Sequence, residues 1–131
     1  MNLKAKGTNA ERELIKMFWE TGEWIAIRSA GSGCSRYPSP DVLAGNRLRR
    51  LAIECKSSGN TSIYIPKEEI AQLEEFSKRF GAEPWLGIRF NSKEWHFISL
   101  DDAKQTLINF AINTDLIKRK GLLFSELIGK I

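Results

Sequence analysis

The chain has 131 residues and carries 20 Lys and Arg against 16 Asp and Glu, a net charge of +4. A hydrophobic fraction of 42% and a charged fraction of 27% are typical of globular proteins and exclude a disordered or fibrous chain. The length fits one domain, which we expect to span residues 1–131. No apolar stretch is long enough to cross a bilayer, and we expect no signal peptide because the N-terminus is charged.

The cysteine and histidine counts restrict the chemistry that the chain can carry. Two cysteines, Cys34 and Cys55, do not make a disulfide framework, so we expect a cytoplasmic protein. A single histidine, His96, argues against several histidine ligands or a histidine-containing triad. Any catalysis must therefore come from carboxylates, lysine and hydroxyl groups. The positive charge favours an anionic partner such as nucleic acid.

The first elements in chain order are a helix, a strand and a loop. Thr8-Asn9-Ala10-Glu11 has the pattern of a capping box, and apolar residues recur at helical spacing after it. A helix is therefore predicted from Thr8 to Thr21, with Gly22 ending it. Residues 24–28 form a predicted strand, and the Gly-, Ser- and Pro-rich residues 29–40 form a predicted loop.

A hairpin follows, in which Gly45-Asn46 joins a strand at 41–44 to a strand at 48–56. After a short strand at 62–65, a helix is predicted to begin at Pro66 and to end at Gly81. Its apolar face is predicted from helical spacing to consist of Ile70, Leu73, Phe76 and Phe80.

The last third of the chain is predicted to hold strands at 85–90 and 94–98, joined by a turn at Asn91-Ser92. A short helix is predicted after Ser99, and further helical pieces at 114–120 and 122–131. The order of all these elements predicts an α/β fold with a mixed central β-sheet flanked by helices.

Two carboxylates and a lysine are predicted to meet at one end of this sheet. Asp41 opens one strand of the hairpin, and Glu54-Cys55-Lys56 closes the other. Residues two apart on a strand share a face, so Glu54 and Lys56 point one way and Cys55 the other. Neighbouring carboxylates repel unless a cation lies between them, and Mg²⁺ prefers a few carboxylates plus water. Such a site suits metal-assisted hydrolysis of a phosphodiester, in which the lysine orients water or stabilises charge.

This spacing by itself is loose, and it is also typical of a solvated hairpin edge that carries surface charges. The apolar run 51–53 before Glu54, and Pro40 before Asp41, favour the site. Glu11 is a third candidate acid, although acids stabilise helix N-termini regardless of function. Glu13 is the competing choice.

Four segments carry a resemblance to a known family. They are Lys6-Gly7-x-x-Ala10-Glu11-Arg12-Glu13-Leu14, Arg28-Ser29-Ala30-Gly31-Ser32-Gly33, Pro40-Asp41-Val42-Leu43-Ala44-Gly45-Asn46 and Ile53-Glu54-Cys55-Lys56. In this order they resemble the archaeal-type Holliday junction resolvases of the restriction-endonuclease-like, PD-(D/E)xK nuclease superfamily. The resemblance implies a restriction-endonuclease-like (tRNA-endonuclease-like) fold. It also implies a Mg²⁺-dependent endonuclease, for which Mn²⁺ can substitute, that makes paired nicks in four-way DNA junctions.

By that resemblance, Glu11, Asp41 and Glu54 correspond to metal-binding carboxylates, and Lys56 to the catalytic lysine. The backbone carbonyl beside Glu54, that of Cys55, would complete the metal shell. The same resemblance makes Ser32 a catalytic-loop serine that contacts the scissile phosphate, and Arg28 a basic residue needed for DNA handling. We interpret three further basic residues as phosphate contacts rather than solubilising charges: Lys4, Lys6 and Arg36.

Two symmetric cuts with one site per chain imply a two-fold homodimer. Phe76, Phe80 and Trp85 belong either to the core or to the dimer interface. We expect no membrane and no small-molecule substrate. Two alternatives stay open, a related nuclease acting on other branched or linear duplex DNA and a non-catalytic junction-binding module. The presence of three acids and a lysine argues against the second.

Overall fold

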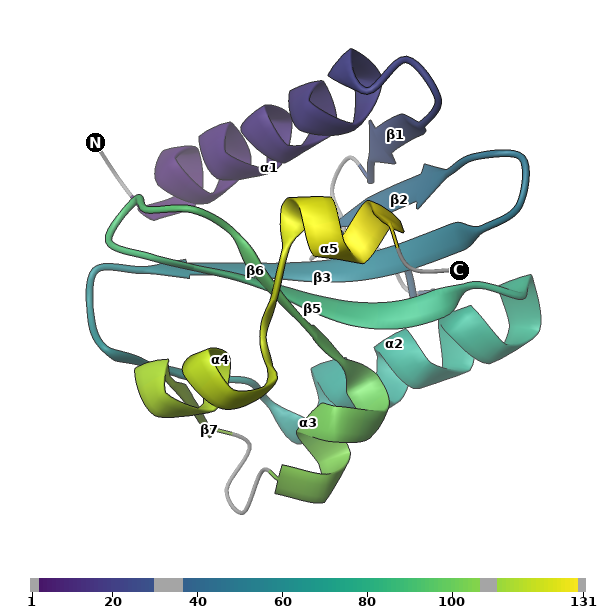
Figure 1. Ribbon diagram of the computed structural model, residues 1–131. Coiled ribbons are helices and arrows are strands. Elements are labelled where there is room, and N and C mark those ends of the chain that lie inside the picture. Colours follow the sequence, from purple (N-terminus) through teal and green to yellow (C-terminus); the bar gives the residue numbers. More distant parts are fainter. Residues whose placement is uncertain (1–2, 30–36, 107–110, 130–131) are drawn as a thin grey trace.

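The computed structural model describes residues 3–29, 37–106 and 111–129 (Figure 1). The helices are α1 (Leu3–Glu20), α2 (Lys67–Phe80), α3 (Leu100–Thr106), α4 (Thr114–Lys120) and α5 (Phe124–Gly129). The strands are β1 (Ile25–Arg28), β2 (Val42–Gly45), β3 (Arg50–Ser58), β4 (Ser62–Tyr64), β5 (Glu83–Phe90), β6 (His96–Ser99), β7 (Ala111–Asn113) and β8 (Leu122–Leu123).

The described residues form a central six-stranded sheet with the order β1-β2-β3-β5-β6-β8, and β4 pairs with β7 beside it. β3 and β5 are parallel, whereas the other neighbours in the large sheet are antiparallel. One core packs α1 and α5 on one face of the sheet. A second core packs α2, α3 and α4 on the other face (Figure 1). The predicted mixed sheet flanked by helices is confirmed.

The first helix begins earlier than the capping-box pattern predicts. α1 starts at Leu3, so Thr8 lies inside the helix, and its hydroxyl accepts a hydrogen bond from Arg28 Nη2 at 3.3 Å. Most of the residues before Thr8 are good helix formers, and they extend the helix through Gly7. The predicted end is confirmed, since Gly22 follows the helix with a φ of 78°. None of the described helices is long and apolar enough to cross a membrane.

The predicted hairpin of β2 and β3 is confirmed, with Val42 opposite Ile53. Asn46 closes its turn, because Oδ1 accepts hydrogen bonds from the backbone N–H groups of Leu48 at 2.9 Å and Arg49 at 2.7 Å. The Arg49 guanidinium then ties the hairpin to the rest of the fold. It donates two hydrogen bonds of 2.8 Å to the Glu83 carboxylate and one of 2.7 Å to the Leu127 carbonyl.

The second helix lies one residue later than predicted, with Pro66 as its N-cap, and Gly81 ends it with a φ of 83°. Ile70 and Leu73 are buried as expected. Phe80 is 48% exposed, which excludes the core for this residue and leaves the dimer interface of the two possibilities stated above.

Of the predictions for the last third of the chain, the start of the last helix differs in the structure. Trp85 is 7% exposed and belongs to the core. The helix after Ser99 is confirmed, and the Ser99 hydroxyl accepts a hydrogen bond from the Asp102 N–H at 3.1 Å. The last predicted helix instead begins as the short strand β8, and α5 starts only at Phe124.

The replacement Glu83→Gln should destabilise the fold in a pH-dependent way. The hydrogen bond from Arg49 lowers the pKa of the Glu83 carboxyl below its ordinary value. The carboxylate therefore stabilises the folded chain above the pKa of the unfolded chain, and this contribution is lost as the pH falls through the lower folded-state pKa. E83Q should unfold at a lower urea concentration than the wild type at neutral pH, and the difference should shrink below about pH 4.

The control for this experiment is Glu75→Gln, because Glu75 pairs with Arg79 on the exposed surface of α2 at 3.8 Å. Its unfolding midpoint should stay close to that of the wild type at every pH. A deficit in E83Q that does not change with pH would contradict the electrostatic origin of the effect.

Candidate active site

The pairing of β2 with β3 brings Asp41 beside the end of β3. Asp41 directly precedes β2, and the register of Val42 opposite Ile53 continues to place Asp41 alongside Glu54. Asp41 Oδ2 accepts a hydrogen bond of 2.8 Å from the backbone N–H of Cys55. This bond fixes the carboxylate against β3, because a backbone N–H in a strand cannot move away as a side chain can. The convergence predicted for these two acids is present in the structure.

The residues at the end of β3 alternate between the two faces of the sheet, as expected. Cys55 packs against the core beneath α1. Glu54 and Lys56 point to the opposite face, where both meet Glu69 of α2. Lys56 Nζ lies 2.6 Å from Glu69 Oε1. One strand end therefore presents an acid and an ammonium group side by side.

The environment of Glu54 strongly disfavours its charged form. Burial is the largest cause, and the nearby Asp41 carboxylate and a hydrogen bond with Glu69 add to it, which raises the pKa of Glu54 to about 9. The Lys56 ammonium acts in the opposite direction. A carboxyl group with such a strongly raised pKa, beside a second acid and a lysine, is typical of functional sites.

Glu11 reaches the site from α1. Its Oε1 accepts a hydrogen bond of 2.8 Å from Arg28 Nε on β1. Burial, followed by the charge of Asp41, raises the pKa of Glu11, and the hydrogen bond from Arg28 opposes this rise. Glu13 instead pairs with Arg89 of β5. Because residues two apart on a helix point to nearly opposite sides, the influence of Asp41 on Glu11 favours Glu11 over Glu13 as the acid of this helix.

In the described residues, Glu11, Asp41 and Glu54 are not arranged as a set of ligands for one metal ion. Among the residues that the structure describes, no three His, Cys, Asp or Glu side chains are placed so that they could hold one metal ion. Carboxylates repel one another, and here Glu11 turns to Arg28 while Glu54 shares a hydrogen bond with Glu69. The oxygen donors themselves fit a hard cation such as Mg²⁺, which takes carboxylates and water, and the mutual repulsion of the acids is what such a cation would relieve.

For most of the other candidate residues, the structure does not describe the side chain. Ser32 and Arg36 fall in residues 30–36, which the structure does not describe. The backbones of Lys4 and Lys6 belong to the start of α1, but their side chains are not described. Glu69, in contrast, was not among the site residues predicted from the sequence. The available signal was weak, because an acid in the first turn of a helix is common for its favourable interaction with the helix dipole.

Comparison with known proteins places the chain in a family. A family model for the archaeal Holliday junction resolvase (Hjc) matches residues 2–131. The crossover junction endodeoxyribonuclease Hjc of Archaeoglobus fulgidus is 38% identical over 128 residues, which are 98% of this chain and 93% of that protein. The protein of the same name from Methanocaldococcus jannaschii is 38% identical over 125 residues, 95% of this chain and 88% of that protein.

A solved structure agrees with the sequence matches. The structure of Archaeoglobus fulgidus Hjc, described as a Holliday junction resolvase from an archaeal hyperthermophile, matches with a TM-score of 0.83 and 36% identity. The match covers 92% of this chain and 97% of that one. The restriction-endonuclease-like fold class predicted from the resemblance is thereby confirmed. Because sequence and fold agree over nearly the whole length, the chain belongs to the archaeal Holliday junction resolvase (Hjc) family.

Proposed function

We propose that this protein is a Holliday junction resolvase, an endonuclease that hydrolyses phosphodiester bonds at paired, symmetric positions in four-way DNA junctions. The observation that carries the proposal is the nearly full-length similarity to proteins named crossover junction endodeoxyribonuclease. The acids and the lysine gathered at the end of β3 support it, because they are the groups that phosphodiester hydrolysis needs.

We assign Glu11, Asp41, Glu54 and the backbone carbonyl of Cys55 to the binding of a divalent cation, Mg²⁺ or Mn²⁺. When bound, such a cation polarises a phosphoryl oxygen and makes water more acidic. Asp41 is held in place for this role by the Cys55 N–H. The Lys56 ammonium, on the same face as Glu54, orients the attacking water or stabilises the negative charge that develops on the phosphate.

We further assign a group of basic and hydroxyl residues to contacts with the DNA backbone. Arg28 lies next to the acids, and its side chain is 30% exposed, so it can reach a phosphate while it contacts Glu11. Positive charge around an acidic site is needed because DNA would otherwise be repelled. The residues assigned to these contacts are Arg28, Lys4, Lys6, Ser32 and Arg36.

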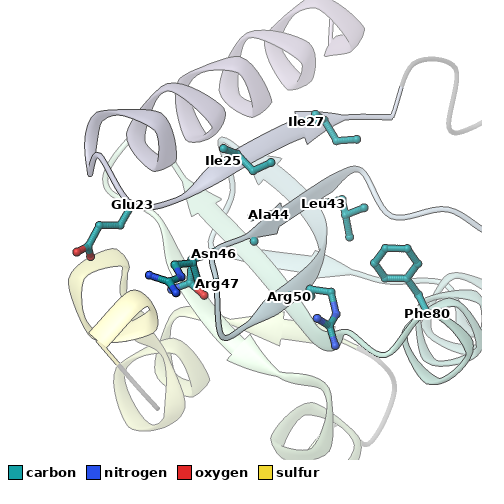
Figure 2. A pocket seen from close by; sticks show the side chains of 10 residues that line it. Glu23, Ile25, Ile27, Leu43, Ala44, Asn46, Arg47, Arg50 and Phe80 are labelled. Atoms are coloured by element: carbon teal, nitrogen blue, oxygen red, sulfur yellow. The ribbon is translucent and has the colours of Figure 1, made fainter.

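We infer that two copies assemble through an uncovered face at the β1–β2 edge of the sheet. Ile25 and Ile27 of β1 are 54% and 56% exposed, and Figure 2 shows them on one surface with Leu43 and with Phe80 of α2. An apolar patch of this kind with a charged rim is typical of protein interfaces.

The rim of this patch fits a second copy of the same chain. Glu23, Arg47 and Arg50 line it (Figure 2). A two-fold axis brings the same surface of each copy together, so that unlike charges of the two rims can face each other. The dimer would supply two active sites, as two symmetric cuts require.

The replacement Asp41→Asn tests the site. Asn keeps an oxygen that can accept the Cys55 hydrogen bond, so the variant should fold, but it lacks the charge that a cation needs. With Mg²⁺, cleavage of a synthetic four-way junction should fall by about 100-fold or more, while binding to the junction, measured by gel shift in Ca²⁺, should persist. The exposed Asp101→Asn of α3 is the matched control and should cut like the wild type.

Three outcomes of this assay would contradict the proposal. Unchanged cutting by D41N would exclude the site. Equal cutting of the junction and of a linear duplex by the wild type would favour a nuclease with a different substrate. A wild type that binds the junction but cuts neither DNA would identify a binding module.

Junction affinity should fall steeply with salt, because each neutralised phosphate releases counterions. In a plot of log affinity against log salt, Arg36→Ala should reduce the slope by about one. Arg79→Ala serves as the control, because the Arg79 side chain is exposed on α2 and pairs with Glu75, and it should leave the slope unchanged. A flat salt dependence in the wild type would contradict the phosphate contacts.

Sedimentation equilibrium at micromolar concentration should report about twice the chain mass of 14.9 kDa. Ile27→Asp places a charge in the apolar patch and should shift the protein to the monomer, because a buried, unpaired carboxylate opposes association. Tyr64→Asp, at another exposed position on β4, should leave the dimer intact. A monomeric wild type would refute the dimer, and a dimeric I27D would place its interface elsewhere.

A further inference from the structure

Glu69 is held next to the active site by the core of the protein. It lies in the first turn of α2, and its N–H donates a hydrogen bond of 3.0 Å to the Pro66 carbonyl. Ile65, just before the helix, is fully buried, and Ile70 is 6% exposed. Because apolar packing anchors the chain on both sides of Glu69, the distance from its backbone to β3 does not depend on the contacts of its own side chain.

The Glu69 carboxyl group forms an ion pair with a residue of the site. Its Oε1 lies 2.6 Å from Lys56 Nζ, and the two side chains are only 30% and 27% exposed. The same carboxyl group lies near enough to Glu54 to contribute to the raised pKa of that residue. Water competes less with this pair than with the exposed Arg79–Glu75 pair farther along α2.

The lysine needs such a partner for a geometric reason. Its ammonium sits on a flexible stem of four methylene groups, whereas catalysis requires a group held close to one position. Glu54 lies two residues away on the same face and is the obvious alternative partner. An ion pair between Lys56 and Glu54 would engage the acid that we assign to the cation. Within the described ranges, the ion pair of Lys56 is made with Glu69 instead.

We propose that Glu69 is a positioning residue for strand cleavage, which holds the Lys56 ammonium on the face of β3 that carries Glu54 through their ion pair. The inference rests on the nuclease function proposed above and adds to it a residue on a different element of the fold. Glu69 acts through Lys56, and its effect therefore requires that lysine.

A labelling experiment on the protein without added metal tests the contact. Lysines are acetylated with N-hydroxysuccinimidyl acetate, and the rate at each lysine is followed by peptide mass spectrometry, with the exposed Lys78 as the internal reference. Glu69→Gln should make Lys56 react several-fold faster, because the ion pair keeps the lysine as an ammonium, whereas the neutral amine is the form that attacks the active ester. Glu68→Gln removes an exposed acid from the same helical turn and should leave the rate at Lys56 unchanged. Equal rates in all three proteins would overturn the proposal.

Cleavage kinetics then test the consequence. Under single turnover with saturating Mg²⁺, E69Q should cut a four-way junction about 10- to 100-fold more slowly than E68Q, with unchanged junction affinity. Glu69→Asp, which keeps the charge on a shorter side chain, should recover part of the rate. In a Lys56→Ala background, E69Q should cause no further loss, because the two residues act as a unit. An equal loss in both backgrounds would assign Glu69 a structural role and overturn the proposal.

The two readouts separate this inference from the proposed function. If the wild type cuts no junction, the resolvase proposal fails, and labelling still decides whether Glu69 holds Lys56. If the wild type cuts and E69Q cuts as fast as E68Q, the positioning role is wrong while the resolvase proposal stands. Because Glu69 is partly exposed at a helix end, E69Q should fold as E68Q does, which thermal unfolding of both verifies.

Discussion

The pairing of β3 with its neighbours is the constraint on which the site depends. β3 is fully buried at Leu51, Ala52 and Ile53, and it becomes partly exposed from Glu54 onward. The acids and the lysine thus begin where the strand leaves the apolar core. This position gives Glu54 a largely apolar environment on one side and access to DNA on the other. Both are needed, because low polarity strengthens electrostatic interactions and a buried site would exclude the substrate.

Two of the acids at this edge have partners from other elements, since Arg28 of β1 pairs with Glu11 and the Cys55 N–H of β3 donates a hydrogen bond to Asp41. The charge of Glu54 is offset by Lys56, two residues farther along the same strand. Like charges held together destabilise a fold unless such partners or a cation offset them. The net charge of +4 is therefore an average over a compact acidic site and a basic remainder of the surface. A cation bound at the acids would make the potential that DNA meets still more positive.

The features that could be predicted from the sequence are those that depend on residues close together in the chain. The turn at Asn46 and the shared face of Glu54 and Lys56 follow from residues adjacent in the chain, and both are present. The start of α1 was mispredicted because the pattern at Thr8 is a local signal, and longer helix propensity overrode it. The exposure of Phe80 and the contact of Glu69 with Lys56 could not be predicted, because both depend on how α2 packs against strands that are distant from it in the sequence.

The short strand β1 links the proposed interface to the site. Successive side chains of a strand point to opposite faces, so Ile25 and Ile27 face the uncovered patch while Ala26 and Arg28 face α1. β1 lies at the edge of the sheet and pairs with β2 alone within the described residues, so it has fewer restraints than the central strands. A second copy packed on the two isoleucines would restrain the strand that carries Arg28, and with it the partner of Glu11. Dimer formation and the geometry of the acids would then be coupled through a single strand rather than by a long-range change of shape.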